Sequence, residues 1–428
     1  MIIRIFSFLN RPTSRNIIIN TIGNYLNVFF TAFFALLLVR IMSPAQYGVL
    51  SVLLGIAYVL ANLLDFGTTA SIYSFLPLLL EKSIAQIHCF IKTTFYYQTL
   101  FSAIVISILF ISFPWLDKNF FKTQVPLWEL YLTAIMVMFL IWQNTGLNML
   151  FAAKKFLRAN IYLNTANFIK TVIIISVALL GKITTGVVLL VFGIVGPVIF
   201  FTFLFLEKKP LVLTVLRSDV KKDEFRFGYT LTYFIASQFY NLSLRMDLFL
   251  LSYFRSKAEV GYYGLAQKII LTIMSTITSI TQVLSPTYSR AKTKKDLLHL
   301  FKTSLLYLLL PCGLFVTLFI LPNQVYNLFF TAKYAQTAMI TKMLSLPYIL
   351  FTLINIPLLF LLYTVKKPFP ILITNIFFFI IITVGNYVLI PIYGVKAPPI
   401  IFSLALVFAG IVLSLTSFQY YCQLKTTK

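Results

Sequence analysis

The sequence has little charge, few acidic residues and almost no cysteine or histidine. Of its 428 residues only 11% are charged, against about 25% in globular domains, and 60% are hydrophobic. The mean hydropathy of +0.92 excludes an ordinary soluble fold. Three cysteines, Cys89, Cys312 and Cys422, and two histidines are too few and too scattered for a disulfide framework or a zinc site. We predict no metal centre.

Motifs of soluble enzymes are also missing. The sequence contains no GxxxxGK[ST] phosphate-binding loop, no HExxH and no GxSxG. No soluble segment of catalytic size separates the apolar runs. We therefore predict a protein that is not an enzyme and has no cofactor, in which an H⁺ or Na⁺ gradient is the candidate source of any energy required.

Long apolar runs recur along the whole chain. A membrane-spanning helix needs about 20 apolar residues, and continuous runs are typical of helices rather than of barrel strands. We predict an all-α integral membrane protein with about twelve transmembrane helices. They are expected at 17–39, 47–66, 93–113, 128–151, 161–180, 186–206, 229–252, 259–284, 298–321, 339–362, 370–390 and 397–421.

The net charge of +24 lies mostly in alternate loops. The termini and the loops after even-numbered helices hold 23 basic residues, and the loops after odd-numbered helices hold nine. Lys170, Arg245 and Lys268 fall inside predicted helices. By the positive-inside rule both termini are expected to be cytoplasmic. Because the excess charge sets topology, a nucleic-acid partner is not expected.

The chain is predicted to have two related halves. The segment SPAQYGVL from Ser43 matches SKAEVGYY from Ser256 at an offset of 213, and AKKF from Ala153 echoes VKKP from Val365 at 212. An even number of helices per half predicts two parallel six-helix repeats, with the substrate path between them. The expected divisions are a cytoplasmic leader at 1–16, an N-lobe at 17–206, a cytoplasmic linker at 207–227, a C-lobe at 228–421 and a cytoplasmic tail at 422–428.

Polar residues recur at helical spacing in five of the predicted helices. Such side chains are costly against lipid, so a polar helix face indicates a water-filled lumen. Interhelical hydrogen bonding is the alternative for any one residue. The internal repeat places some of these helices in equivalent positions of the two halves. Polar stripes on such equivalent helices favour a cavity shared by both halves. They comprise Asn20, Asn24, Asn27 and Thr31; Ser51, Gly55, Tyr58, Asn62, Asp65 and Thr69; Asn160, Asn164, Asn167 and Thr171; Gln238, Asn241, Arg245 and Ser252; and Lys268, Thr272, Ser275, Ser279 and Gln282.

The charged residues within predicted helices are Asp65, Lys170, Arg245, Asp247 and Lys268. Intramembrane ionisable residues are functional candidates, and three basic to two acidic side chains favour an anionic substrate. Arg245 and Asp247 are two positions apart and cannot pair within one helix. The structural alternative for Asp247 is a buried salt bridge with Lys170 or Lys268, and that for Asp65 is capping of a helix end.

Several motifs resemble those of a known family. RIMSPAQYG from Arg40, DFG from Asp65, RMDLFLLSYFRSKAEVGYYGLAQ from Arg245 and LIPIYGVKAP from Leu389 are similar to segments of Wzx-type polysaccharide flippases. These belong to the multidrug/oligosaccharidyl-lipid/polysaccharide exporter (MOP) superfamily. Met42, Ser43 and Lys396 depart from the family pattern. The residues that fit its central motif are Asp247, Leu251, Glu259, Val260, Gly261, Tyr263 and Ala266.

The resemblance implies a MATE-like, V-shaped transporter with alternating access in a bacterial inner membrane. Its substrate would be an undecaprenyl-pyrophosphate-linked oligosaccharide repeat unit for O-antigen or capsule. A polysaccharide polymerase and a chain-length regulator would be its partners, besides membrane lipids. Charge-assisted hydrogen bonds suit a pyrophosphate that cannot cross hydrocarbon bare. The expected substrate ligands are Arg245, Lys268, Lys170, Asn24, Asn27, Gln238 and Asn241, and the expected ion-coupling residues are Asp65 and Asp247.

Two other functions stay open from the sequence. A multidrug/cation antiporter of the same superfamily would favour an acidic lumen, the opposite of the basic surplus within the predicted helices. A membrane polysaccharide polymerase or glycosyltransferase usually carries a large external loop, and none is predicted here.

Overall fold

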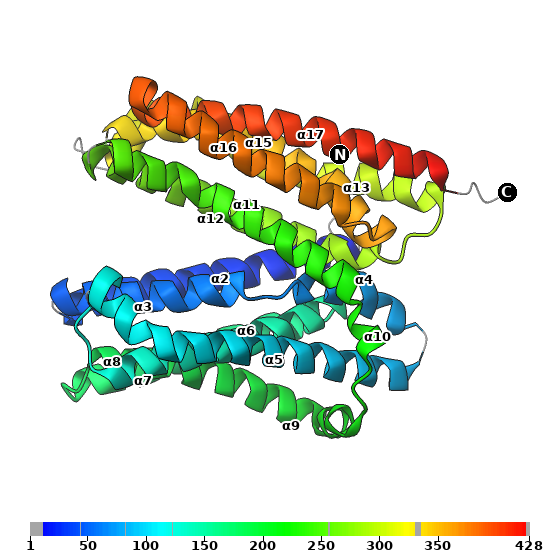
Figure 1. Cartoon of the computed structure of the whole chain (residues 1–428), viewed down its shortest axis with the longest axis horizontal. Coiled ribbons are helices and arrows are strands. Elements are labelled where there is room, and N and C mark those ends of the chain that lie inside the picture. The colour runs from blue at the N-terminus through cyan, green and yellow to red at the C-terminus, as the bar shows by residue number, and fades with distance from the viewer. Residues whose placement is uncertain are drawn as a thin grey trace. The chain divides into compact units, whose positions relative to one another are not determined.

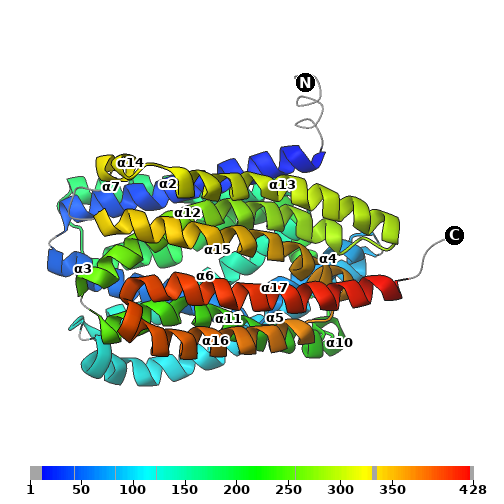
Figure 2. The same ribbon diagram turned by 90° about the horizontal axis from the view of Figure 1, so that it is seen from above.

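The computed structural model describes residues 12–42, 44–81, 83–121, 123–255, 257–329 and 335–424. Within these ranges the chain is almost entirely helical and contains no strand. It divides into two compact units, Met1–Thr230 and Leu231–Lys428. Each unit is a bundle of long helices (Figures 1 and 2).

In the first unit α6 is the central helix and packs against α3, α4, α5, α7 and α9. Its buried face carries Ala134, Val137 and Ile141, which belong to the hydrophobic core of this unit. A π-helical segment, η2 (Val191–Val195), joins α8 to α9. The helices are α2 (Pro12–Ile41), α3 (Pro44–Leu63), α4 (Thr68–Leu79), α5 (Ile84–Leu116), α6 (Leu127–Ala152), α7 (Phe156–Leu179), α8 (Thr185–Leu190), α9 (Gly196–Arg217) and α10 (Lys222–Phe225).

In the second unit α15 is central and packs against α12, α13 and α17. The start of α13 follows from its sequence, because Thr293 and Asp296 form a reciprocal capping box. The helices are α11 (Phe227–Phe254), which begins just before the unit boundary, α12 (Lys257–Tyr288), α13 (Lys294–Ile320), α14 (Asn323–Phe329), α15 (Ala335–Leu359) with the π-helical η4 (Phe360–Val365), α16 (Phe369–Tyr393) and α17 (Ala397–Gln423).

Each of the twelve predicted apolar runs coincides with helical structure, which confirms the all-α class. By length and composition, eight helical segments among the described residues could cross a membrane, or nine if a bent pair counts as one span. One of the eight, Phe369–Gln423, contains both α16 and α17.

Two segments differ from the prediction. The stretch 207–227, expected to be a linker loop, is mostly helical, because α9 continues to Arg217 and α10 follows it. The separate helix α4 is the second difference. The chain breaks after α3 at Phe66 and Gly67, which have φ angles of 49° and 72°, and α4 restarts at an angle of 47° to the end of α3. The left-handed backbone ends α3 close to residue 66, where the predicted run ends, and the helix that follows it was not predicted.

The internal repeat is visible in the backbone. The α2–α3 connection lies between Ile41 and Pro44, and the α11–α12 connection lies between Phe254 and Lys257, again at an offset of 213. The AKKF and VKKP segments each place a lysine, Lys154 and Lys366, at a left-handed φ of 59°. Both lysines lie just after the end of a helix, so the two turns share a conformation that non-glycine residues seldom adopt.

Candidate functional site

Asp65 lies at the break between α3 and α4. Its carboxylate accepts hydrogen bonds from the hydroxyl of Thr68 at 2.8 Å and from the hydroxyl of Thr69 at 3.0 Å. It also accepts one from the backbone N–H of Thr69 at 3.3 Å. These bonds satisfy donors in the first turn of α4. The geometry matches the capping alternative for Asp65, and ion coupling by this residue stays a prediction.

A polar network surrounds this break. The Gln98 side chain on α5 donates to the carbonyl of Leu64 at 2.8 Å and accepts from Thr68 at 3.1 Å. Asn148 on α6 donates to the Thr69 hydroxyl at 2.8 Å. Gln98 and Asn148 were not among the predicted site residues, although Thr94 and Ser102 lie one turn from Gln98 and Asn144 lies one turn from Asn148. Only the fold brings them to Asp65.

Substituting Asp65 distinguishes capping from ion coupling. Asp65→Ala is expected to lower the stability of the first unit by about 1 kcal/mol, because the donors of α4 lose their acceptor. Asp65→Asn keeps an acceptor oxygen and should restore most of that stability in a thermal unfolding measurement. If capping is the whole role, the Asn variant transports normally, and loss of transport in a stable Asn variant would establish coupling.

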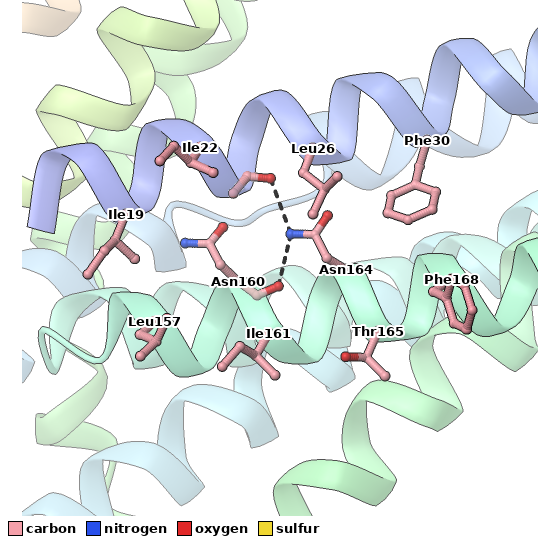
Figure 3. Close-up of a pocket in the computed structure, with 11 residues that line it drawn as sticks. Ile19, Ile22, Leu26, Phe30, Leu157, Asn160, Ile161, Asn164, Thr165 and Phe168 are labelled. Atoms are coloured by element: carbon pink, nitrogen blue, oxygen red, sulfur yellow. Dashed lines mark hydrogen bonds between the residues drawn. The ribbon is translucent and has the colours of Figure 1, made fainter.

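The asparagine stripe of α2 faces the asparagine stripe of α7. Three side chains of α7 donate to α2 in parallel register, and Figure 3 shows the central one, Asn164, which also bonds the Asn160 carbonyl. Interhelical hydrogen bonding, the alternative to a lumen, therefore accounts for most of this stripe. The interhelical bonds join Asn160 to Asn20 at 3.0 Å, Asn164 to the Gly23 carbonyl at 3.2 Å and Asn167 to Asn27 at 2.8 Å.

Gly23 is required for this close approach. A Cβ atom at residue 23 would lie 2.0 Å from Oδ1 of Asn160 and 2.7 Å from its Cβ. Gly23→Ala is therefore expected to destabilise the α2–α7 pair by about 1–3 kcal/mol. The matched control is Gly55→Ala on α3, where a Cβ atom meets nothing within 4 Å and should be neutral or stabilising. Equal melting temperatures for the two variants would contradict this.

Lys170 is buried in the first unit, with 9% of its surface exposed. Its amine lies 5.2 Å from the ring centre of Phe192 and 6.0 Å from that of Phe34, and its aliphatic chain packs on Gly196. Cation–π contacts stabilise such an amine. In the part of the chain that the structure describes, it makes no ion pair or hydrogen bond. A role for Lys170 in substrate binding stays a prediction.

A second polar site lies inside the second unit. A cavity of about 10 Å³, the space of about one water-sized species, is lined by residues of α11, α12, α15, α16 and α17. Asp247 lies on its wall and accepts a hydrogen bond from the hydroxyl of Tyr263. The cavity is lined by Ser243, Leu244, Asp247, Tyr263, Gln267, Leu344, Tyr348, Ile382, Asn386, Pro398 and Phe402.

The unpartnered side chain of Asn386 indicates that this cavity holds a water molecule or an ion. Its side chain is fully buried, and neither its amide oxygen nor its amide nitrogen has a hydrogen-bond partner within the described residues. A buried amide without partners costs several kcal/mol, so such groups usually contact a water or an ion. Asn386 was not predicted as a site residue, because it follows an apolar stretch of α16 and shows no helical repeat.

The polar stripe of α12 is different from that of α2. Lys268 and Thr272 are exposed on a helix that is apolar enough to cross a membrane. The hydroxyls of Thr272 and Ser275 donate to carbonyls of their own helix rather than to a neighbour. On α11, Gln238 and Asn241 are partly exposed, and the side chain of Arg245 lies outside the described part of the structure.

The sequence matches the model of one family, described as polysaccharide biosynthesis protein, over residues 13–292. No curated protein matches.

Solved structures match nearly the whole chain. A multidrug resistance MATE family transporter of the MOP superfamily, in an outward-facing conformation, has a TM-score of 0.76 at 13% identity, covering 97% of this chain and 96% of that one. A MOP superfamily transporter from Pyrococcus furiosus has a TM-score of 0.74 at 14% identity, covering 97% of this chain and 96% of that one. A mutant of a Vibrio cholerae MATE transporter has a TM-score of 0.74 at 10% identity, covering 97% of this chain and 98% of that one. The chain belongs to the polysaccharide biosynthesis protein family and has the fold of MATE transporters of the MOP superfamily.

Proposed function

We propose that this protein is a flippase for undecaprenyl-pyrophosphate-linked oligosaccharide repeat units. It moves them across a bacterial inner membrane by alternating access, for assembly of a surface polysaccharide such as O-antigen or capsule. Membership of the polysaccharide biosynthesis family and the transporter fold support a membrane exporter in general. The proposal of a pyrophosphate-linked substrate rests on the exposed polar side chains of α12.

The exposed polar face of α12 is the observation that carries the proposal. An exposed Lys268 with Thr272 one turn later cannot lie against hydrocarbon without a large cost, so this face needs a water-filled region. A lysine in such a region attracts an anion, and a pyrophosphate offers several strong acceptors for its three donors. Gln238 and Asn241 add amide groups suited to sugar hydroxyls. A cation antiporter would be served poorly by this face.

The cavity at Asp247 supports coupling to a monovalent cation. One carboxylate with neutral amide oxygens nearby suits H⁺ or Na⁺, since a divalent ion usually takes more than one carboxylate. Among the described residues no group of three or more His, Cys, Asp or Glu side chains is placed to hold a metal. Asn386 would serve as a neutral ligand or hydrogen-bond partner for the occupant.

The proposal includes the topology and the partners. The surplus of basic residues in alternate loops favours cytoplasmic termini and a linker on the same side. A polymerase and a chain-length regulator acting on the outer surface are the expected partners, because flipped repeat units must then be joined.

Deleting the gene and extracting lipid-linked sugars tests the function. A flippase defect leaves complete repeat units on the lipid carrier facing the cytoplasm, shielded from an impermeant sugar-modifying reagent in intact spheroplasts. Single units already accessible from outside would instead identify a polymerase. Normal polysaccharide with altered drug tolerance would favour the multidrug antiporter.

A further inference from the structure

A groove of about 460 Å³ lies between α2 and α7 on the first unit (Figure 3). Its walls are almost wholly apolar, and they are exposed on both sides: Ile22 by 63%, Ile161 by 51% and Phe168 by 58%. It is lined by Ile19, Ile22, Gly23, Leu26, Phe30, Leu157, Asn160, Ile161, Asn164, Thr165 and Phe168.

The length of the groove matches one leaflet of a bilayer. The bonds of Asn20 to Asn160 and of Asn27 to Asn167 set α2 and α7 parallel, with a residue of α2 level with the residue 140 positions later. The groove runs along α2 from Ile19 to Phe30. At about 1.5 Å per residue this is roughly 16 Å, and half of a hydrocarbon core is about 15 Å.

Exposed basic side chains among the described residues gather at the end of the groove near Ile19. Arg15 precedes Ile19 by one helical turn and, in the register above, lies level with Lys155. Lys154 and Arg158 flank Lys155, and all four side chains are exposed. Arg158 pairs with Glu207 at 2.7 Å, so this end keeps a positive balance. The opposite end is formed by Phe30 and Phe168.

We propose that this groove is a binding site for an anionic phospholipid of the cytoplasmic leaflet. One acyl chain lies between α2 and α7, and the phosphate headgroup contacts Arg15, Lys154 and Lys155. Since lipid tails are as apolar as the walls, the groove retains a chain through van der Waals fit rather than through the hydrophobic effect. Gly23 and the hydrogen bonds of Asn160 and Asn164 hold its width constant. The site does not depend on the proposed transport activity, and only its assignment to the cytoplasmic leaflet rests on the proposed topology.

Photolabelling tests the chain-binding part of the site. The full-length protein is reconstituted in phosphatidylcholine nanodiscs with a small fraction of phosphatidylglycerol that carries a diazirine in one acyl chain, and labelled peptides are mapped by mass spectrometry. We expect α2 and α7 to be labelled more strongly than the exposed face of α17. Ile161→Trp or Ile22→Trp fills the groove and should remove that excess, whereas Ile411→Trp on α17, at a position 54% exposed, should not. Equal labelling of both faces, or labelling unchanged in both groove variants, would overturn the proposal.

Neutralising the basic side chains tests recognition of the lipid headgroup. Arg15→Gln and Lys155→Gln should each lower the preference for phosphatidylglycerol over phosphatidylcholine by about fivefold, the size expected for one basic residue near an anionic lipid. Lys302→Gln on α13 should leave the preference unchanged. Soluble glycerol phosphate at millimolar concentration should not displace the lipid, because the chain supplies part of the affinity. Displacement by glycerol phosphate would identify a free-phosphate site instead, and an unchanged preference in both Arg15→Gln and Lys155→Gln would refute the headgroup contact.

Discussion

Replacing Lys268 by glutamate is expected to abolish polysaccharide export while the amount of protein in the membrane stays normal. The side chain is exposed, so folding does not depend on it. A hydrogen bond to a charged group contributes about 1.5–3 kcal/mol, so Lys268→Ala alone should lower transport about 10- to 100-fold, and the reversed charge should repel the pyrophosphate further. Surface polysaccharide in a deletion strain complemented with each variant is the measurement.

Lys302→Glu is the matched control, because Lys302 is also exposed but lies near the basic end of α13. It should support normal export. Arg245→Ala, one turn of α11 after Asn241, is expected from the sequence to behave like Lys268→Ala. Normal export in both the Lys268 and Arg245 variants would refute the assignment of these residues to substrate binding.

Asp247→Asn should remove coupling. The carboxylate is the acidic side chain among the residues that line the second unit's cavity, so its neutral isostere leaves nothing to attract a cation. We expect transport to fall at least about tenfold, as for loss of one hydrogen-bonded charge, and the remainder to be insensitive to the Na⁺ or H⁺ gradient. Transport into proteoliposomes with each gradient imposed separately identifies the ion.

Two variants separate coupling from packing at this site. Tyr263→Phe removes the hydroxyl that donates to Asp247 but keeps the negative charge, so it should weaken transport without abolishing its gradient dependence. Asn386→Leu fills the cavity and removes the unpartnered amide, and it should abolish gradient dependence while raising thermal stability. If Asp247→Asn retains full gradient-dependent transport, the coupling site lies elsewhere.

Hydrophobic runs were sufficient to predict the long helices. Twelve runs correspond to twelve stretches of helix because a backbone in lipid must satisfy its own hydrogen bonds, and few other structures are permitted. The predicted run 47–66 ends at the break, but α4 was missed because its 12 residues are fewer than the about 20 that a spanning run needs. The helical end of the predicted linker was missed because charged residues also occur on helices that continue beyond the membrane.

The candidate site was predictable only in part. Helical spacing identified the polar sides of α2 and α12 but not the groups that their side chains contact. On α2 the asparagines meet those of α7, and on α12 the hydroxyls bond their own backbone. Asn386 was not found, since the segment around it is apolar, and Gln98 was not found although Thr94 and Ser102 lie one turn on either side of it. Their significance depends on neighbours distant in sequence, such as Leu64, which is 34 positions from Gln98.

The asparagine pairing between α2 and α7 also has a mechanical consequence. Three bonds in one parallel register, from Asn20 to Asn27, fail together if either helix slides by a single residue. The two helices therefore resist sliding along their axes, and we expect them to tilt together as one rigid body. A force applied to either helix is therefore transmitted to the other over a length of about two turns.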